Sequence, residues 1–132
     1  MKKRNTKISI VLLLAPLLLM AVYTGDLDSI AQAIRTGNAK SLAAYFDSTV
    51  ELKINDKEGA YSKAQAEQVV KDFFVKNPPK GFSFLHDGPS GGNNAHYAIG
   101  TLTTANGKFR TYIYLKKKGD AYFIQEISFE NE

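Results

Sequence analysis

Residues 97–116 read YAIGTLTTANGKFRTYIYLK, and the rest of the fold can be arranged around this stretch. Apolar and polar residues alternate on both sides of Asn106-Gly107, which is the period of a half-buried strand. Asn-Gly is a strong short-range hairpin signal, because both central residues of a type I′ turn have positive φ. The stretch therefore predicts two antiparallel strands, 96–104 and 108–116, joined by a two-residue turn at Asn106-Gly107.

Counting outward from this turn gives the hairpin two different faces. One face is aliphatic and is expected to carry the helices, with room for a helix or a shallow pocket beside the small residues Ala98 and Gly100. Its predicted pairs are Thr104 with Phe109, Leu102 with Thr111, Gly100 with Ile113, and Ala98 with Leu115. The other face is aromatic and Thr-rich, and its predicted pairs are Thr103 with Arg110, Thr101 with Tyr112, Ile99 with Tyr114, and Tyr97 with Lys116.

Further strands are predicted at 50–54, 82–86 and 122–129, and the polar residues 55–59 are expected to turn the chain. The register of the last strand has two alternatives. A two-residue turn at 118–119 puts Tyr122 and Ile124 on the core face, whereas a loop longer by one residue puts there Phe123, Ile127 and Phe129. We favour the longer loop because it buries more apolar surface.

Three helices are predicted before the strand-rich half of the chain. The first begins at Asp26 as N-cap and ends at Gly37, which suits the left-handed position after a helix. Asn38 is expected to cap a short second helix, whose buried stripe would be Leu42, Ala43, Tyr45 and Phe46.

The longest helix is predicted to begin after Ser62, which forms a capping box with Gln65, and to end before Pro78-Pro79. Its apolar residues recur with the period of a helix that buries one face, at Ala66, Val69, Val70, Phe73 and Phe74.

Residues 1–24 are typical of a secretory signal peptide. Four basic residues, Lys2, Lys3, Arg4 and Lys7, precede an apolar run at 8–23, which is the order of such a leader. The run falls short of the roughly 20 apolar residues that cross a bilayer as a helix, so cleavage near Ala21 or Thr24 is favoured over an uncleaved anchor. The chain is therefore expected to be exported to a periplasmic or extracellular location, with residues 25–132 as a single domain.

The formal net charge of +4 reflects this leader. The whole chain has 17 basic and 13 acidic side chains, and without the four basic residues of the leader the two signs balance. A neutral domain gives no support for nucleic-acid binding. The chain contains no Cys, so disulfides, lipid attachment through Cys and Cys-based metal or redox sites are excluded.

A set of segments carries a resemblance to a known family: Gly37-Asn38-Ala39, Tyr45-Phe46, the run 61–67, Phe73-Phe74, His86-Asp87-Gly88, the run 97–100 and Phe109-Arg110. Over residues 26–129 the chain resembles the nuclear-transport-factor-two-like (cystatin-like) superfamily, and within it an exported family of unknown function. The resemblance implies a cone-shaped α+β fold: two short helices and one longer helix packed on a curved antiparallel sheet. Superfamily enzymes of the isomerase or dehydratase kind place an Asp or His base and a Tyr donor inside the cone, and many other members are binding or dimerisation modules.

Candidate chemistry from the residues themselves is sparse. Residues 88–92 match G-x-S-x-G, but a strand rather than a helix is predicted to follow, so the nucleophile elbow lacks its structural context. His86 and His96 lack the spacing and companions of a zinc site, and no metal or cofactor is expected. His86 is interpreted as a residue that orders its loop, with a pocket role as the alternative. Three lysines at 116–118 are expected at an exposed hairpin tip, where Lys blunts unwanted pairing.

The cluster Tyr97, Arg110, Tyr112 and Tyr114 is the predicted binding site, since Tyr and Arg are enriched in interface hot spots; an ordinary solvated sheet face is the alternative. These observations favour an exported binding or interaction module over an enzyme. The module is expected to form a homodimer or to dock a protein partner through this face. Two alternatives place the site inside the cone. One is an isomerase or dehydratase using His86 or a Tyr, and the other is a carrier of a small apolar ligand.

Overall fold

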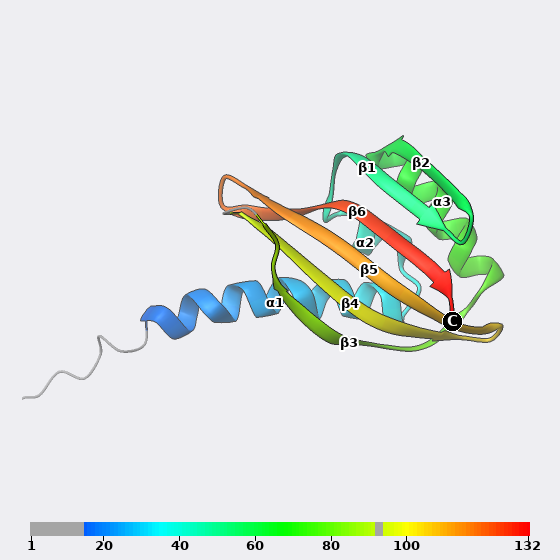
Figure 1. Ribbon diagram of the computed structural model, residues 1–132, viewed down its shortest axis with the longest axis horizontal. Helices are drawn as coiled ribbons and strands as arrows, with labels where there is room; N and C mark the ends of the chain where they lie inside the picture. Colours follow the sequence, from blue (N-terminus) through cyan, green and yellow to red (C-terminus); the bar gives the residue numbers. More distant parts are fainter. Residues whose placement is uncertain (1–14, 92–93) are drawn as a thin grey trace, which may run out of the picture.

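The computed structural model describes residues 15–91 and 94–132, with side chains from residue 25 onward. Its helices are α1 (Ala15–Arg35), α2 (Ala39–Ala43) and α3 (Lys63–Lys76). Its strands are β1 (Phe46–Ile54), β2 (Lys57–Ser62), β3 (Pro79–Pro89), β4 (Ala95–Thr104), β5 (Gly107–Lys118) and β6 (Ala121–Asn131). The strands form one curved sheet in the order β2-β1-β6-β5-β4-β3 (Figure 1). All neighbours are antiparallel except β1 and β6, which run parallel.

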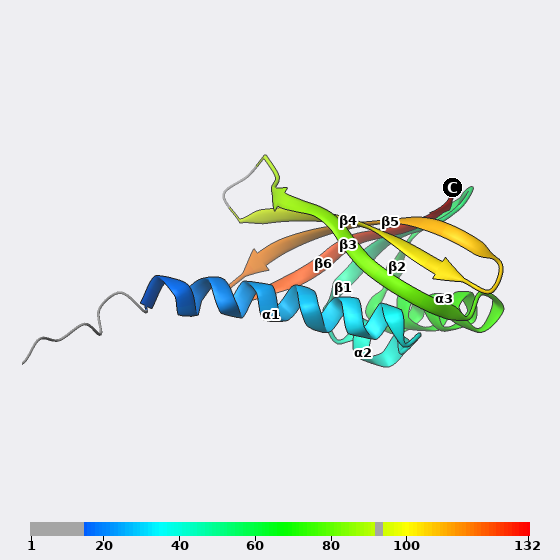
Figure 2. The same cartoon turned by 90° about the horizontal axis from the view of Figure 1, so that it is seen from below.

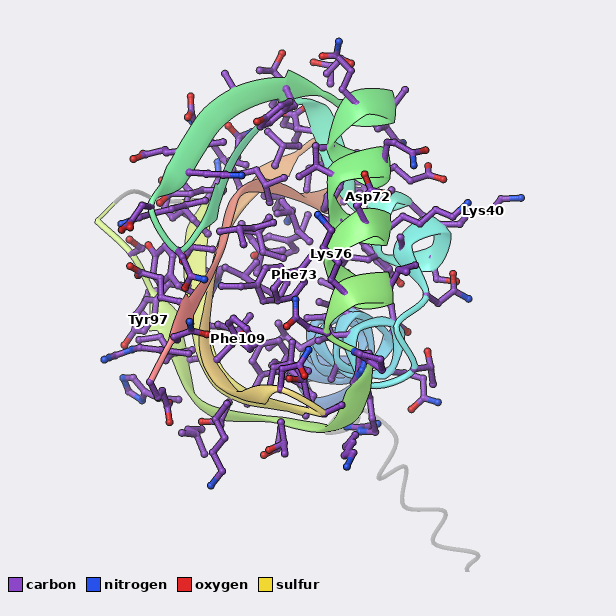
Figure 3. All side chains as sticks on the ribbon, turned by 90° about the vertical axis from the view of Figure 1, so that its right-hand side faces the viewer. Lys40, Asp72, Phe73, Lys76, Tyr97 and Phe109 are labelled. Carbon is purple, nitrogen blue, oxygen red and sulfur yellow. The ribbon has the colours of Figure 1, made fainter. Side chains whose placement is uncertain are left out.

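The three helices lie on one side of the sheet, which curves around them (Figures 2 and 3). Figure 3 shows Phe73 of α3 and Phe109 of β5 pointing into the space between helix and sheet. The Phe73 ring stacks on Phe129 at 4.6 Å between centroids and meets Phe109 edge-on at 5.0 Å, the arrangements that aromatic pairs prefer. The predicted α+β architecture is therefore confirmed, and phenylalanines fill its interior.

The first helix begins before the predicted position, and with 21 residues it is longer than the 14-residue α3, which was predicted to be the longest helix. Asp26 is an interior residue of α1 rather than its N-cap, because the Leu- and Ala-rich residues before it favour helix and Gly25 alone costs only about 1 kcal/mol. The predicted end is confirmed: Gly37 has φ 65°, and the amide of Asn38 donates to Ala33 O at 2.8 Å, as in a Schellman motif. None of the described helices is both long enough and apolar enough to cross a membrane. The basic start of the predicted leader lies outside the described residues.

Asn38 caps α2 as predicted, its side chain accepting from the Ser41 amide at 3.0 Å. Leu42 and Ala43 are buried, but Phe46 belongs to β1 rather than to the helical stripe. The capping box of α3 is confirmed in both directions, between Ser62 and Gln65.

The polar segment 55–59 contains a strand that the sequence analysis assigned to a turn. Only Asn55 and Asp56 form the turn, with Asn55 at φ 53°, and β2 begins at Lys57. β2 is an edge strand whose side chains are exposed or half-buried, so backbone pairing with β1 defines it rather than an apolar pattern.

The β4–β5 hairpin has the predicted faces but a different register. Thr104 pairs with Gly107 and Leu102 with Phe109, so each residue meets a partner two positions nearer the turn than predicted. The prediction of a type I′ turn at Asn106-Gly107 is wrong, since Asn106 does not have a positive φ. The Thr104 hydroxyl instead accepts from the Asn106 amide at 3.0 Å and donates to Gly107 O at 2.9 Å. A shift of two residues keeps every side chain on its predicted face.

The last strand combines both predicted registers. A two-residue turn pairs Lys118 with Ala121 and buries Ile124, and a bulge between Ile124 and Glu126 then brings Ile127 and Phe129 into the core. Phe123, placed in the core by the favoured longer loop, is only half-buried. The extra residue of a bulge switches the inward-facing side chains from even-numbered to odd-numbered positions. Neither of the two predicted registers therefore holds along the whole strand.

Candidate functional site

The sheet face opposite the helices, here called the outer face, holds all four residues of the predicted cluster. Tyr97 pairs with Tyr114, and Tyr112 lies between Ile99 of β4 and Ser128 of β6. Arg110 lies opposite Glu130 on β6. The four side chains thus lie along the middle strands of the outer face, and Figure 3 shows Tyr97 on the outside of the curve.

A hollow of about 330 Å³, here called the outer hollow, opens on this face. It crosses β2, β1, β6, β5 and β4, and its lining residues are Glu51, Leu52, Lys53, Glu58, Ile99, Arg110, Tyr112, Glu126, Ser128 and Glu130. Tyr112 and Arg110 line the hollow, whereas Tyr97 and Tyr114 do not line it and lie on the neighbouring surface. The structure therefore divides the predicted cluster into two parts.

The acidic lining is the part that sequence reasoning missed. Glu51 and Glu58 come from β1 and β2, and Glu126 and Glu130 come from β6. They meet only because β6, the last strand, inserts between β1 and β5. The available signal was the alternation of Glu126, Ser128 and Glu130 with buried residues, which marks them as outward-facing.

Acidic side chains outnumber basic ones in the lining of the outer hollow. Lys53 Nζ lies 3.2 Å from Glu130 Oε1. This hydrogen bond, together with the negative charge of Glu130, raises the pKa of Lys53 above its ordinary value. Burial raises the pKa of Tyr112, and the nearby Glu126 carboxylate and Tyr114 hydroxyl raise it further. Tyr112 is therefore protonated at neutral pH and can donate a hydrogen bond.

His86 and Tyr97 form a contact on the outer face of β3 and β4. The Tyr97 hydroxyl lies 2.5 Å from His86 Nε2, and the two side chains belong to the neighbouring strands β3 and β4. His86 is exposed, so it lies outside the cone interior. Among the residues that the structure describes, no group of three or more His, Asp and Glu side chains could hold a metal ion.

Comparison with known proteins assigns the chain to a family. A family model described as "Domain of unknown function (DUF4783)" matches residues 27–130. This chain belongs to the DUF4783 family. A DUF4783 structure from Bacteroides ovatus has 30% identity and a TM-score of 0.74, covering 79% of this chain and 93% of its own. No curated protein matches the chain.

More distant structures show only which fold this DUF4783 domain has. An NTF-2-like protein of unknown function from Silicibacter pomeroyi has 11% identity and a TM-score of 0.64, covering 89% of this chain and 99% of its own. A domain of unknown function with a cystatin-like fold from Nostoc punctiforme has 9% identity and a TM-score of 0.60, covering 87% of this chain and 78% of its own. The resemblance to the nuclear-transport-factor-two-like fold is therefore confirmed.

The buried side chains of the DUF4783 domain are mostly apolar. Among the described residues, the buried polar side chains are Thr104, Thr111 and, on the outer face, Ser128, and none of them is ionisable. A second hollow, of about 260 Å³, opens between α3 and β1–β2 and is lined in part by Ile54, Val69 and Phe73. Its lining also includes the exposed charged residues Lys57, Asp72 and Lys76 and the half-buried Tyr61.

Proposed function

We propose that this DUF4783 domain is an exported binding module that docks a protein partner through its outer face. The observation that carries the proposal is the outer hollow, which places Tyr112 and Arg110 together on the sheet face that the helices leave uncovered. Tyr and Arg are the residue types that most often dominate the binding energy of protein interfaces. The leader-like residues 1–24 support export, because the order of basic and apolar residues is that of a signal peptide.

The side chains of the outer face suit protein recognition better than small-molecule chemistry. Tyr supplies apolar area with a polar tip and loses little entropy on binding, since it has two rotatable bonds. Arg110 adds a planar cation with several donors. Tyr97 and Tyr114 extend the aromatic surface beyond the outer hollow along β4 and β5, which favours a partner larger than the hollow itself.

The partner can be a different protein or a second copy of the chain, and solution size separates the two. Light scattering on the purified chain gives the oligomeric state. Affinity capture from the compartment to which the chain is exported then gives any other partner. We expect Tyr112→Ser with Tyr114→Ser to abolish either association, and Val75→Ser, an exposed apolar residue on α3, to leave it intact.

A monomer in every variant, with no partner whose capture depends on Tyr112 and Tyr114, would overturn the proposal. Circular dichroism of each variant guards against a trivial loss of folding, because Tyr112 and Tyr114 are only half-buried and their removal leaves the inner face untouched.

A second candidate function is transport of a small apolar ligand in the second hollow, supported by the apolar part of its lining, which includes Ile54, Val69 and Phe73. Native mass spectrometry of the chain purified from its own compartment would reveal the added mass. An isomerase or dehydratase has less support, because His86 lies on the outer face and the described interior holds no buried ionisable group to move a proton.

A further inference from the structure

We infer that the outer hollow receives a lysine or arginine side chain from an extended segment of a different protein. The inference rests on the proposed function and adds to it the chemistry of the partner. Its basis is an acidic lining with unpaired carboxylates, combined with the hydroxyl of a nearly buried serine that opens into the hollow and makes no hydrogen bond within the described residues.

The first step is the charge of the lining. Four glutamates face two cations, Lys53 and Arg110. Lys53 is engaged by Glu130 at 3.2 Å, whereas Glu51, Glu58 and Glu126 take part in no salt bridge within the described residues. The outer hollow therefore carries an excess of negative charge, which attracts a cationic group and repels an anionic one.

The second step is the position of Glu51 and Glu126. They are direct partners in the parallel pairing of β1 and β6, where neighbouring strands lie about 4.8 Å apart, and like charges directly opposite each other destabilise a sheet. The inner face enforces this pairing, because the adjacent partners Leu52 and Ile127 are both buried. Folding thus brings two carboxylates together, and a bound cation would relieve their repulsion.

The third step is Ser128, which lies on β6 between Tyr112 and Lys53. Its side chain lines the outer hollow although the residue is only 7% exposed. Within the described residues its hydroxyl makes no side-chain hydrogen bond. The small exposed part of this residue opens into the outer hollow, so its hydroxyl is free to accept a hydrogen bond there. An ammonium or guanidinium group entering the outer hollow would donate to this oxygen.

The fourth step is the shape of the site. A volume of about 330 Å³ is at the lower end of ligand pockets and suits one long side chain rather than a folded element. The aliphatic stem of lysine or arginine can pack against Ile99, and its charged end can approach the face of the Tyr112 ring in a cation–π contact. The open surface around Tyr97 and Tyr114 would hold the flanking backbone of the segment.

The test is fluorescence anisotropy of the full chain with short fluorescein-labelled peptides. One peptide alternates lysine with glycine, and its matched control alternates glutamate with glycine. We expect the lysine peptide alone to bind, with an affinity that falls as sodium chloride is raised. Glu51→Gln with Glu126→Gln should weaken binding about tenfold, and Ser128→Ala about threefold.

The control variant Glu67→Gln with Asp72→Asn removes the same net charge from α3 and should leave the affinity within about twofold, because α3 lies on the opposite side of the sheet from the outer hollow (Figure 2) and salt screens exposed charges. The variant Glu51→Gln with Glu126→Gln should also unfold at a higher urea concentration without peptide, since it removes the repulsion. Equal weakening by both double variants would overturn the inference, as would a lysine peptide that binds no better than the glutamate peptide.

Two outcomes separate this inference from the proposed function. If a captured partner depends on Tyr112 and Tyr114 but neither on Glu51 nor on Glu126, the docking face stands and the cationic segment is wrong. If the chain self-associates, and Lys116→Ser with Lys117→Ser abolishes the association, the occupant is a second copy and the assignment to a different protein is overturned.

Discussion

A methyl group at Gly100 would collide with β3. A Cβ built there lies 2.5 Å from the Ser83 carbonyl oxygen and 2.8 Å from the Phe82 ring. The space that the sequence analysis left for a helix or pocket beside Gly100 is therefore taken by Phe82, whose ring covers this position.

We expect Gly100→Ala to lower the free energy of unfolding by about 1–3 kcal/mol, because overpacking forces backbone and ring to shift. Urea denaturation measures the change. Gly81→Ala is the matched control on β3, since its Cβ would meet no atom within 4 Å. Equal stability of the two variants would contradict the close approach at Gly100.

Asp47 connects the start of β1 to the tip of the β5–β6 hairpin. Its Oδ2 lies 2.6 Å from Lys118 Nζ and accepts from the Gln125 side chain. Hydrogen bonding to Lys118 is the largest cause that lowers the pKa of Asp47 below 3.8, and the Ser48 amide contributes further. Ionised Asp47 therefore stabilises the folded state.

We expect Asp47→Asn to cost about 1 kcal/mol at neutral pH. Because the pKa is lower in the folded state, the stabilisation is complete above the ordinary value of 3.8 and is lost as the pH falls through the folded pKa. Urea midpoints of the chain and the variant should thus converge on acidification. Asp28→Asn, on the exposed side of α1, is the control and should leave the urea midpoint at neutral pH nearly unchanged.

The residues of the outer face show what alternation alone can predict. Tyr97, Arg110, Tyr112 and Tyr114 were assigned to one face from the parity of their positions, and parity survives any shift by an even number of residues. Glu51 and Glu126 could not be joined in this way, because a parallel pairing between β1 and β6 leaves no turn between them from which to count.

The hairpin between β4 and β5 shows the limit of a turn motif at the scale of an element. Asn106 is held by contacts outside the hairpin: its side chain donates to Lys76 O at 2.7 Å, at the end of α3. Together with the two hydrogen bonds of Thr104, this contact favours a turn at Ala105-Asn106. Tertiary contacts thus override the local preference of Asn-Gly.

The capping box of α3 offers a prediction at the same scale. The Gln65 amide donates to Ser62 Oγ at 3.3 Å, and the Ser62 amide donates to Gln65 Oε1 at 3.3 Å. We expect Ser62→Ala to lower the free energy of unfolding by about 1 kcal/mol, whereas Ser62→Asp should retain the cap. Thermal melts followed at 222 nm measure both variants; equal losses would argue against the cap.

Predictability of the other elements depended on how much apolar surface each one buries. α3 was predicted closely because its caps and its buried stripe agree. β2 was missed because it buries no large side chain completely, and the register of β6 was missed because Gln125, at its bulge, bonds Asp47, a residue far away in the sequence.

At the scale of the whole molecule, the buried core of the described side chains begins at Leu27. Figure 2 shows the first part of α1 extending beyond the sheet. We therefore expect residues 25–132 to fold without the preceding segment, with an unfolding transition close to that of the full chain. Removing residues 1–35 should instead unfold the domain, because Ile30 and Ile34 are fully buried. Near-ultraviolet circular dichroism distinguishes the two truncated chains, and loss of structure in both would contradict this boundary.

The parallel pairing of β1 with β6 also sets an order of events during synthesis. β1 and β2 can form a hairpin early, but their connection to the rest of the sheet is β6, which ends at Asn131. Contacts between residues so distant in sequence form slowly, because a long loop must close first. A chain that emerges N-terminus first thus cannot close its sheet until β6 has left the ribosome, so the β1–β2 hairpin stays unattached to the other strands until that point.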